Sequence, residues 1–227
     1  MLAEGMKDTR NIEVRKSSLM SVAAIAGRHF DETTGYSAAV AAGSVAPTLS
    51  ARRLPLTSPT ISDNAVLEQL RRSAQDSDPV VRHLAGYALG NVSGPDSLAQ
   101  LRVMLTDGNR LAQANAAIGL ARNGSADCVP TMIQLLTTSL NPFEYHPDPA
   151  AKDNAAPDVV QQAEARHQIE ESQIARNCLK AVADLWPQID PENRASLTAI
   201  ITQVEQAFPA PDVRQQASEL LTLIGQP

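Results

Sequence analysis

The segment from Asp76 to Leu140 reads as two copies of one unit that lie 31 residues apart in the chain. Aligning the copies at that offset pairs Asp76 with Asp107, Val80 with Leu111, Ala85 with Ala116 and Leu89 with Leu120. The match continues through the following segment, where Leu98, Leu101 and Leu105 fall on Val129, Met132 and Leu136. A unit of this length cannot bury its apolar face alone, so neighbouring units have to stack on one another. The sequence therefore predicts a solenoid, a fold whose main functional feature is an extended surface.

Each unit is expected to be a pair of helices. Apolar residues recur at spacings of three and four, with no sustained alternation of period two, which is the pattern of amphipathic helices. Aromatic residues make up 3% of the chain, and the small aliphatic side chains that dominate its apolar content suit close helix packing. The predicted fold class is therefore all-α, an α-solenoid.

The clearest pair of helices covers residues 63–91. Asp63 stands where the N-cap of the first helix is expected, ahead of a stripe that includes Val66 and Leu70. Pro79 opens the second helix, because proline is tolerated at the first helical position and not in the interior. The same reasoning places further helices at 96–106, 109–122, 126–140, 158–185, 191–208 and 212–224.

Residues 1–27 fit the template as a partial N-terminal repeat, with a helix over 11–27 that ends at Gly27. Residues 1–7 would form the preceding helix, with Leu2 and Met6 facing inward. Because solenoids need polar caps at their ends, we expect this chain to be the tail of a longer protein, or Met1 not to be the native start. A secretory signal at residues 19–26 is the alternative, and the acidic residues that precede it favour the repeat helix.

Two segments interrupt the repeats. Residues 28–62 are rich in Gly, Ser, Thr, Ala and Pro, and we expect a flexible insertion or linker there. A loop insertion is expected at 141–157, which begins with three prolines in nine residues, a density that forbids a regular helix. The repeat domain proper is therefore expected at 63–227.

Charge and composition narrow the classes of partner. The net charge is −6, and residues 141–227 hold six basic against thirteen acidic side chains. With a pI near 5.2 and no clustered basic stripe, we expect no nucleic-acid binding. No run approaches the roughly eighteen apolar residues of a membrane span, so we expect no membrane span and a cytoplasmic protein. Cys128 and Cys178 fall on packed helix faces and are expected to be reduced, buried thiols.

The phrase Asp-x-Asp-Pro-x-Val-Arg-x-x-Ala-x-x-Ala-Leu-Gly, at residues 76–90, resembles HEAT-like repeats of the type first noted in phycobilisome lyases. Weaker matches lie at 107–121, 175–185 and 212–224. The resemblance implies HEAT-like helical hairpins stacked into a right-handed superhelix. Families built on such repeats include scaffolds, adaptors, bilin lyases and a few nucleic-acid enzymes, so the fold does not settle the function.

The resemblance also implies a ladder, in which an Asp before the turn and an Arg that opens the second helix bridge successive repeats. The residues that match this pattern are Asp78, Arg82, Arg15, Arg176 and Arg214. The second copy has Gln113 where the arginine is expected, so we expect the ladder to break there. Binding of an acidic ligand by these arginines is the alternative to a structural role.

Second helices of such pairs commonly line the concave side of the solenoid. On that basis the expected partner-binding residues are His83, Tyr87, Asn91, Ile118 and Arg122. The small residues expected to set the curvature beneath them are Ala85, Ala88, Ala116 and Gly119.

Phe143 and Tyr145 are partner-binding candidates of a different kind. They are two of six Phe and Tyr residues, and they stand in the proline-stiffened loop rather than on a helix stripe. Aromatic anchors on a stiff loop lose little entropy on docking, which suits partner recognition. Folding back over the groove between helices is an equally good explanation.

Catalysis finds little support in the sequence. No glycine loop has a phosphate-binding pattern, and no Cys or His pair has zinc spacing. His167 has Glu164 and Glu171 at helical neighbour spacing, and His146 stands near Asp148, but solvated charges are the commoner explanation. We therefore expect no catalytic, metal or cofactor site.

The leading hypothesis is a non-catalytic scaffold or adaptor. Its concave face and its 141–157 loop would bind a protein or peptide partner, including other domains of a longer native chain. A lyase-like enzyme or chaperone that holds a tetrapyrrole or similar cofactor on the concave face is the second hypothesis.

Overall fold

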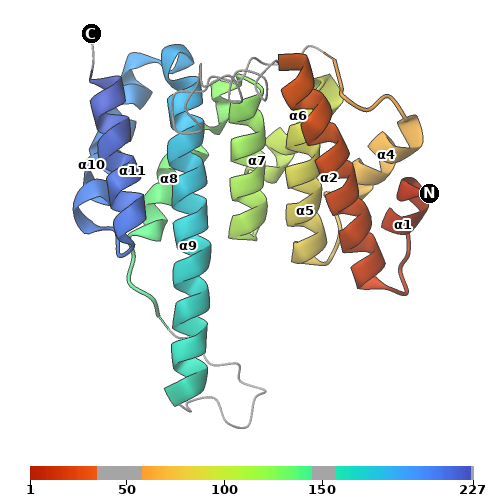
Figure 1. Cartoon of the computed structure of the whole chain (residues 1–227), viewed down its shortest axis with the longest axis horizontal. Coiled ribbons are helices and arrows are strands. Elements are labelled where there is room, and N and C mark those ends of the chain that lie inside the picture. The colour runs from red at the N-terminus through yellow and green to blue at the C-terminus, as the bar shows by residue number, and fades with distance from the viewer. Residues whose placement is uncertain (35–57, 145–156, 226–227) are drawn as a thin grey trace.

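The structure is a computed structural model that describes residues 1–34, 58–144 and 157–225. All regular structure in these ranges is helical, and the helices follow one another in pairs along the molecule in two layers (Figure 1). This arrangement confirms the predicted all-α solenoid.

The first helix of each pair belongs to one layer and the second helix to the other. The first layer consists of α1 (Leu2–Met6), α4 (Asn64–Ser73), α6 (Pro95–Met104), α8 (Val129–Ser139) and α10 (Pro191–Ala207). The second layer consists of α2 (Ile12–Thr34), α5 (Pro79–Val92), α7 (Arg110–Arg122), α9 (Pro157–Leu185) and α11 (Pro211–Ile224). Two 3₁₀ turns, η1 (Ala126–Cys128) and η2 (Trp186–Gln188), precede α8 and follow α9.

Helix starts are set by local chemistry that the sequence displays. The Asp63 carboxylate accepts from the backbone N–H of Ala65 at 2.9 Å, and the Asp78 carboxylate accepts from that of Val80 at 2.8 Å. Such caps satisfy backbone donors that have no partner within the helix. Proline stands in the first turn of α5, α6, α10 and α11, where its missing N–H costs nothing.

The second layer is the more closely packed of the two. Helices α2, α5, α7, α9 and α11 pack on one another in chain order, whereas α4, α6 and α8 of the first layer are more widely separated. A row of helix pairs curves toward its closer side, so the second helices line the concave face.

The closest approach in this layer lies between Gly90 of α5 and Gly119 of α7. A Cβ atom built on Gly90 would lie 2.7 Å from the Gly119 Cα, and one built on Gly119 would lie 2.9 Å from the Gly90 Cα. Ala85, Ala88 and Ala116, on the same two helices, are also buried. Glycine at the crossing therefore allows the backbones of adjacent repeats to touch.

The predicted end of the N-terminal helix at Gly27 is wrong, because α2 continues to Thr34. A single glycine inside a helix costs about 1 kcal/mol relative to alanine, which the packing of α2 on α5 offsets. The short α1 precedes it, with Met6 buried and Leu2 packed against the core. Most of the predicted 28–62 insertion, residues 35–57, lies outside the described residues.

Helix α9 is the exception to the regular pairing. It has 29 residues and is therefore about 43 Å long, roughly twice the length of the 14-residue α5. Its N-terminal half projects beyond the other helices (Figure 1). We refer to residues 157–172 as the α9 arm. Within the described ranges, none of the helices combines the length and hydropathy of a membrane span.

Candidate functional site

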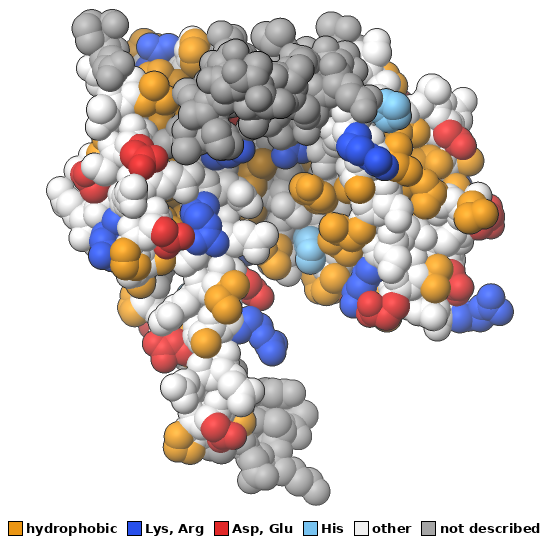
Figure 2. Space-filling model, in the orientation of Figure 1, with side chains coloured by type: hydrophobic (Ala, Val, Ile, Leu, Met, Phe, Trp, Pro, Cys, Tyr) orange, Lys and Arg blue, Asp and Glu red, His pale blue; other side chains and the backbone are white. Residues whose placement is uncertain are grey.

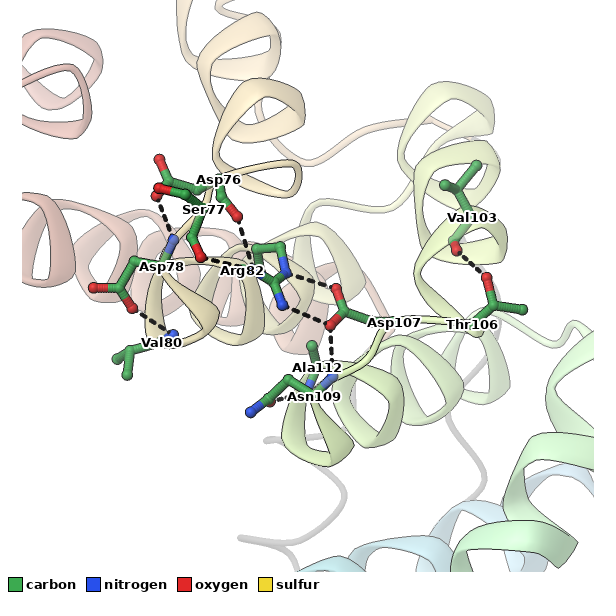
Figure 3. A network of polar contacts seen from close by, with 10 residues as sticks. All are labelled: Asp76, Ser77, Asp78, Val80, Arg82, Val103, Thr106, Asp107, Asn109 and Ala112. Atoms are coloured by element: carbon green, nitrogen blue, oxygen red, sulfur yellow. Dashed lines mark hydrogen bonds and ion pairs between the residues drawn. The ribbon is translucent and has the colours of Figure 1, made fainter. Parts of the chain in front are cut away.

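The best-formed polar site on the second layer centres on Arg82, at the start of α5 (Figure 3). Its guanidinium donates from Nε to Asp107 Oδ2 at 2.8 Å and from Nη2 to Asp107 Oδ1 at 2.9 Å. Nη1 donates to the carbonyl oxygens of Asp76 and Ser77 at 2.8 and 3.1 Å. The arginine therefore closes the turn of its own repeat and binds the turn of the next one.

Charge in this network is balanced. Hydrogen bonding to Asp107 raises the pKa of Arg82, and hydrogen bonding from Arg82 lowers the pKa of Asp107 below its usual range. Both side chains are largely buried, so no free charge is offered to an acidic ligand. The geometry supports the structural role that the resemblance implied for Arg82.

The ladder continues in both directions from this network. Arg15 pairs with Asp76, and Arg176 donates to Asp212 at 2.6 Å. At the position where Gln113 was expected to break the ladder, Arg110 supplies the guanidinium instead, because it lies at the first residue of α7. It reaches Glu171 of α9 at 2.6 and 3.0 Å.

Two residues of the predicted ladder have different contacts. Asp78 caps α5, and the carboxylates that meet the ladder arginines come from other residues, among them Asp76 and Asp107. Arg214 donates to the carbonyl oxygens of Phe208 and Pro209 at 2.6 and 3.0 Å, which repeats the contact of Arg82 with its own turn.

A second ladder runs along the first layer, and sequence reasoning missed it. Arg71 of α4 donates to Asp96 at 2.8 Å, and Arg102 of α6 donates to Asp127 at 2.6 Å. The two pairs are related by the 31-residue offset, which was a usable signal. Their side chains are well exposed, so each pair contributes little to stability.

The predicted concave-face residues lie on α5 and α7, which pack on each other. Tyr87 is 40% exposed, and His83, Ile118 and Arg122 are half-buried. Asn91 is only 2% exposed, so it does not offer a contact surface. Its side chain accepts from Arg122 and donates to the Tyr87 carbonyl oxygen, and it therefore orients its neighbours.

Asparagines bind the two helices together beneath this face. Asn115 of α7 donates to the His83 carbonyl oxygen at 2.8 Å. Asn123 is buried and donates to the carbonyl oxygens of Gly90 and Gly119 at 3.0 and 2.7 Å. The residues of the face are thus carried on a rigid support, which sequence reasoning did not identify.

The surroundings of His83 shift its pKa. Burial lowers its pKa below the usual range, Asp78 opposes the shift, and Lys16 reinforces it. The imidazole is therefore neutral at neutral pH and presents one donor and one acceptor.

The face is hollowed between its α9 side and its α5 side, with hydrophobic, basic and histidine side chains interspersed (Figure 2).

The second candidate surface lies at the α9 arm. Phe143 is half-buried, and its ring centroid lies 5.1 Å from that of His167 on the arm. Tyr145, the other aromatic candidate, and His146 with Asp148 lie outside the described residues. A cavity of about 930 Å³ lies beside the Phe143 ring, between the arm and the turn that joins α10 to α11.

The carboxylates proposed as neighbours of His167 are used in other ways. Glu171 is bound to Arg110 and accepts from the Ser139 hydroxyl at 2.5 Å, while Glu164 accepts from Gln168. In the part of the chain that the structure describes, no group of three or more His, Cys, Asp or Glu side chains is arranged to hold a metal ion.

Both cysteines are free and buried. Burial raises the pKa of Cys128 and of Cys178 to about 12. Neither thiol is ionised near neutral pH, so neither is a candidate nucleophile.

A scan of protein-family models and a search of curated proteins found no match to this chain. Among solved structures, it is similar to an engineered protein from the Northeast Structural Genomics Consortium, with 18% identity over 98% of this chain and 94% of that chain and a TM-score of 0.39. It is also similar to a designed armadillo repeat protein, with 13% identity over 99% of this chain and 98% of that chain and a TM-score of 0.38. These values bear on no detail of the site. Membership of the HEAT-like family stays a prediction.

Proposed function

We propose that the chain is a non-catalytic scaffold that binds a protein or peptide partner on the concave face formed by α2, α5 and α7. The observation that carries the proposal is the exposure of Tyr87 on α5, with half-buried His83 one turn before it on the same helix and half-buried Ile118 and Arg122 on the adjoining α7. Tyrosine and arginine are enriched among the few residues that contribute most of the binding energy at protein interfaces.

Rigidity supports the same proposal. The Arg82 network, the Gly90–Gly119 contact and the buried asparagines hold α5 and α7 in one relative position. A surface that is already ordered loses less entropy when a partner docks. The hypothesis of a bound tetrapyrrole or similar cofactor is not favoured, and cytoplasmic location stays a prediction.

The test is quantitative affinity capture with matched variants. Tyr87→Ala combined with Ile118→Ala removes two side chains of the proposed face, and Val103→Ala removes an exposed aliphatic side chain from α6 in the other layer. We expect proteins that the wild type and the Val103 variant retain to be lost with the double variant. Retention of the same proteins by all three chains, with unchanged melting temperatures, would refute the proposed face.

A further inference from the structure

The cavity beside the α9 arm has three walls from different parts of the chain. The arm forms one wall, the chain that leaves α8 forms the second, and the α10–α11 turn forms the third. Its volume of about 930 Å³ lies within the range of preformed binding sites. We refer to it as the arm groove.

Specific contacts hold each wall in place. The base of the arm is fixed by Glu171, whose side chain is 8% exposed and which binds Arg110 and Ser139. The second wall is held to the arm by the contact of Phe143 with His167. The third wall is joined to α9 by the exposed Arg176–Asp212 pair. Each wall thus has at least one specific contact with the arm or its base.

The inner surface of the arm groove is mostly apolar. Ile169 lines it and is 66% exposed, the same exposure as Val103 and more than any other large aliphatic side chain described apart from Met1. Pro142, Phe143 and Pro209 extend this surface on the other two walls. A large aliphatic side chain left open inside a concave site gains the most from a partner that covers it.

Charge around the groove is negative. The charge of Glu171 is balanced by Arg110 and that of Asp212 by Arg176. Glu164, also in the lining, accepts from the neutral amide of Gln168 at 3.3 Å, so its charge remains available. In the sequence, residues 141–227 hold thirteen acidic against six basic side chains.

From these contacts we infer that the arm groove binds a basic amphipathic peptide segment of a protein partner. Large aliphatic side chains of the segment cover Ile169 and Phe143, and a Lys or Arg meets Glu164. The inference rests on the proposed scaffold function and adds a second contact site to it, with a stated partner chemistry.

The experiment uses fluorescence anisotropy with a labelled amphipathic Leu/Lys peptide as the probe and a Leu/Glu peptide of equal length as the control. We expect the full chain to bind the Leu/Lys peptide in preference to the Leu/Glu peptide, and binding to weaken as salt is added. Ile169→Ala and Glu164→Lys are each expected to weaken binding about tenfold.

Each variant has a matched control outside the groove. Val103→Ala removes an aliphatic side chain of equal exposure from α6. Glu219→Lys on α11 changes a glutamate that accepts from Gln215, four residues away, as Glu164 accepts from Gln168. Neither control is expected to change the affinity for the probe.

Several outcomes would overturn the inference. The first is equal affinity for the Leu/Lys and the Leu/Glu peptide. The second is equal affinity of the groove variants and their controls for the probe. The third is self-association of the chain, detected by sedimentation, that blocks the groove. If the affinity for the probe depends on Tyr87 and Ile118 instead of Ile169, the proposal for the arm groove is refuted and the proposal for the concave face is supported. Binding of the probe that depends on Ile169, while the concave-face variants behave like wild type, would support the arm groove, and the concave face would then still be judged by the affinity-capture experiment.

Discussion

The repeats on either side of α7 are joined in different ways. Toward the N-terminus, α5 meets α7 through glycines, alanines and an Arg82–Asp107 pair that spans 25 residues of chain. Toward the C-terminus, α7 meets α9 through an Arg110–Glu171 pair that spans 61 residues. On the first side the carboxylate stands in a turn, and on the second it stands inside a helix.

The difference shows how one interaction pattern accommodates an insertion. Residues 168–174 contain neither glycine nor proline, so nothing stops the helix where the earlier repeats have a turn. Glu171 then takes over the position that Asp107 fills in the preceding repeat, and the chain before it projects as the α9 arm. We refer to the α5–α7 contact as the regular side and to the α7–α9 contact as the irregular side. The regular side supports the concave face, and the irregular side carries the arm that borders the groove.

The largest predicted effect breaks the regular side. Gly90→Ala places a Cβ atom 2.7 Å from the Gly119 Cα, which belongs to the backbone and cannot rotate away. We expect the free energy of unfolding to fall by about 3 kcal/mol in urea denaturation, because overpacking forces the helices apart. Gly108→Ala is the control, since no atom lies within 4 Å of its added Cβ. Equal stability of the two variants would show that α5 and α7 are not in backbone contact.

The next effect tests the irregular side. Arg110→Ala leaves the Glu171 carboxylate buried without its cation, and we expect a loss of about 2 kcal/mol. Hydrogen exchange should increase in residues 157–172 before it increases in α5. Arg176→Ala, which removes an exposed pair with Asp212, should cost less than half as much. If exchange rises evenly along the chain, Glu171 does not anchor the arm.

A pH titration of the free energy of unfolding should distinguish the largely buried carboxylate of Asp107 from the exposed carboxylate of Asp212. The pKa of Asp107 is lowered in the folded protein by its hydrogen bond from Arg82, so its contribution is complete above the unfolded pKa and is lost as pH falls through the folded pKa. We expect Asp107→Asn to cost about 1 kcal/mol at neutral pH and to flatten the loss of stability below about pH 4. Asp212→Asn, at an exposed pair, should change the profile less. The same pH profile for both variants would show that the buried Asp107 and the exposed Asp212 contribute equally to stability.

The smallest effect concerns the ladder of the first layer. Arg71→Ala removes an exposed pair with Asp96, and we expect the free energy of unfolding to change by less than about 0.5 kcal/mol. Thermal denaturation measures it. A loss above 1 kcal/mol would mean that the first layer also depends on its ion pairs.

Much of the fold could be predicted from the sequence, because its signals are local. Asp63 and Pro79 mark helix starts by chemistry that acts within a few residues. Gly27 gave the opposite result, since a residue that weakens a helix did not end one that packs along α5. Local preferences determined where the helices begin, and tertiary packing determined the length of α2.

The candidate site was less predictable. The sequence indicated that Tyr87, His83, Ile118 and Arg122 share a face, but it could not show that Asn91 is buried beneath them. Arg110 was missed because it stands three residues before the expected position, and only the course of α9 reveals its partner. The arm groove joins segments that are far apart in the chain, so no local pattern announces it.

By itself the sequence determined that this chain is a row of helix pairs, because repeat length, helical periodicity and capping residues are properties of short segments. The tertiary structure alone decided how closely each layer packs, which carboxylate meets each arginine, and that the α9 arm borders a groove. Those features depend on distances between residues that are remote in the chain, and such distances are fixed only when the repeats pack.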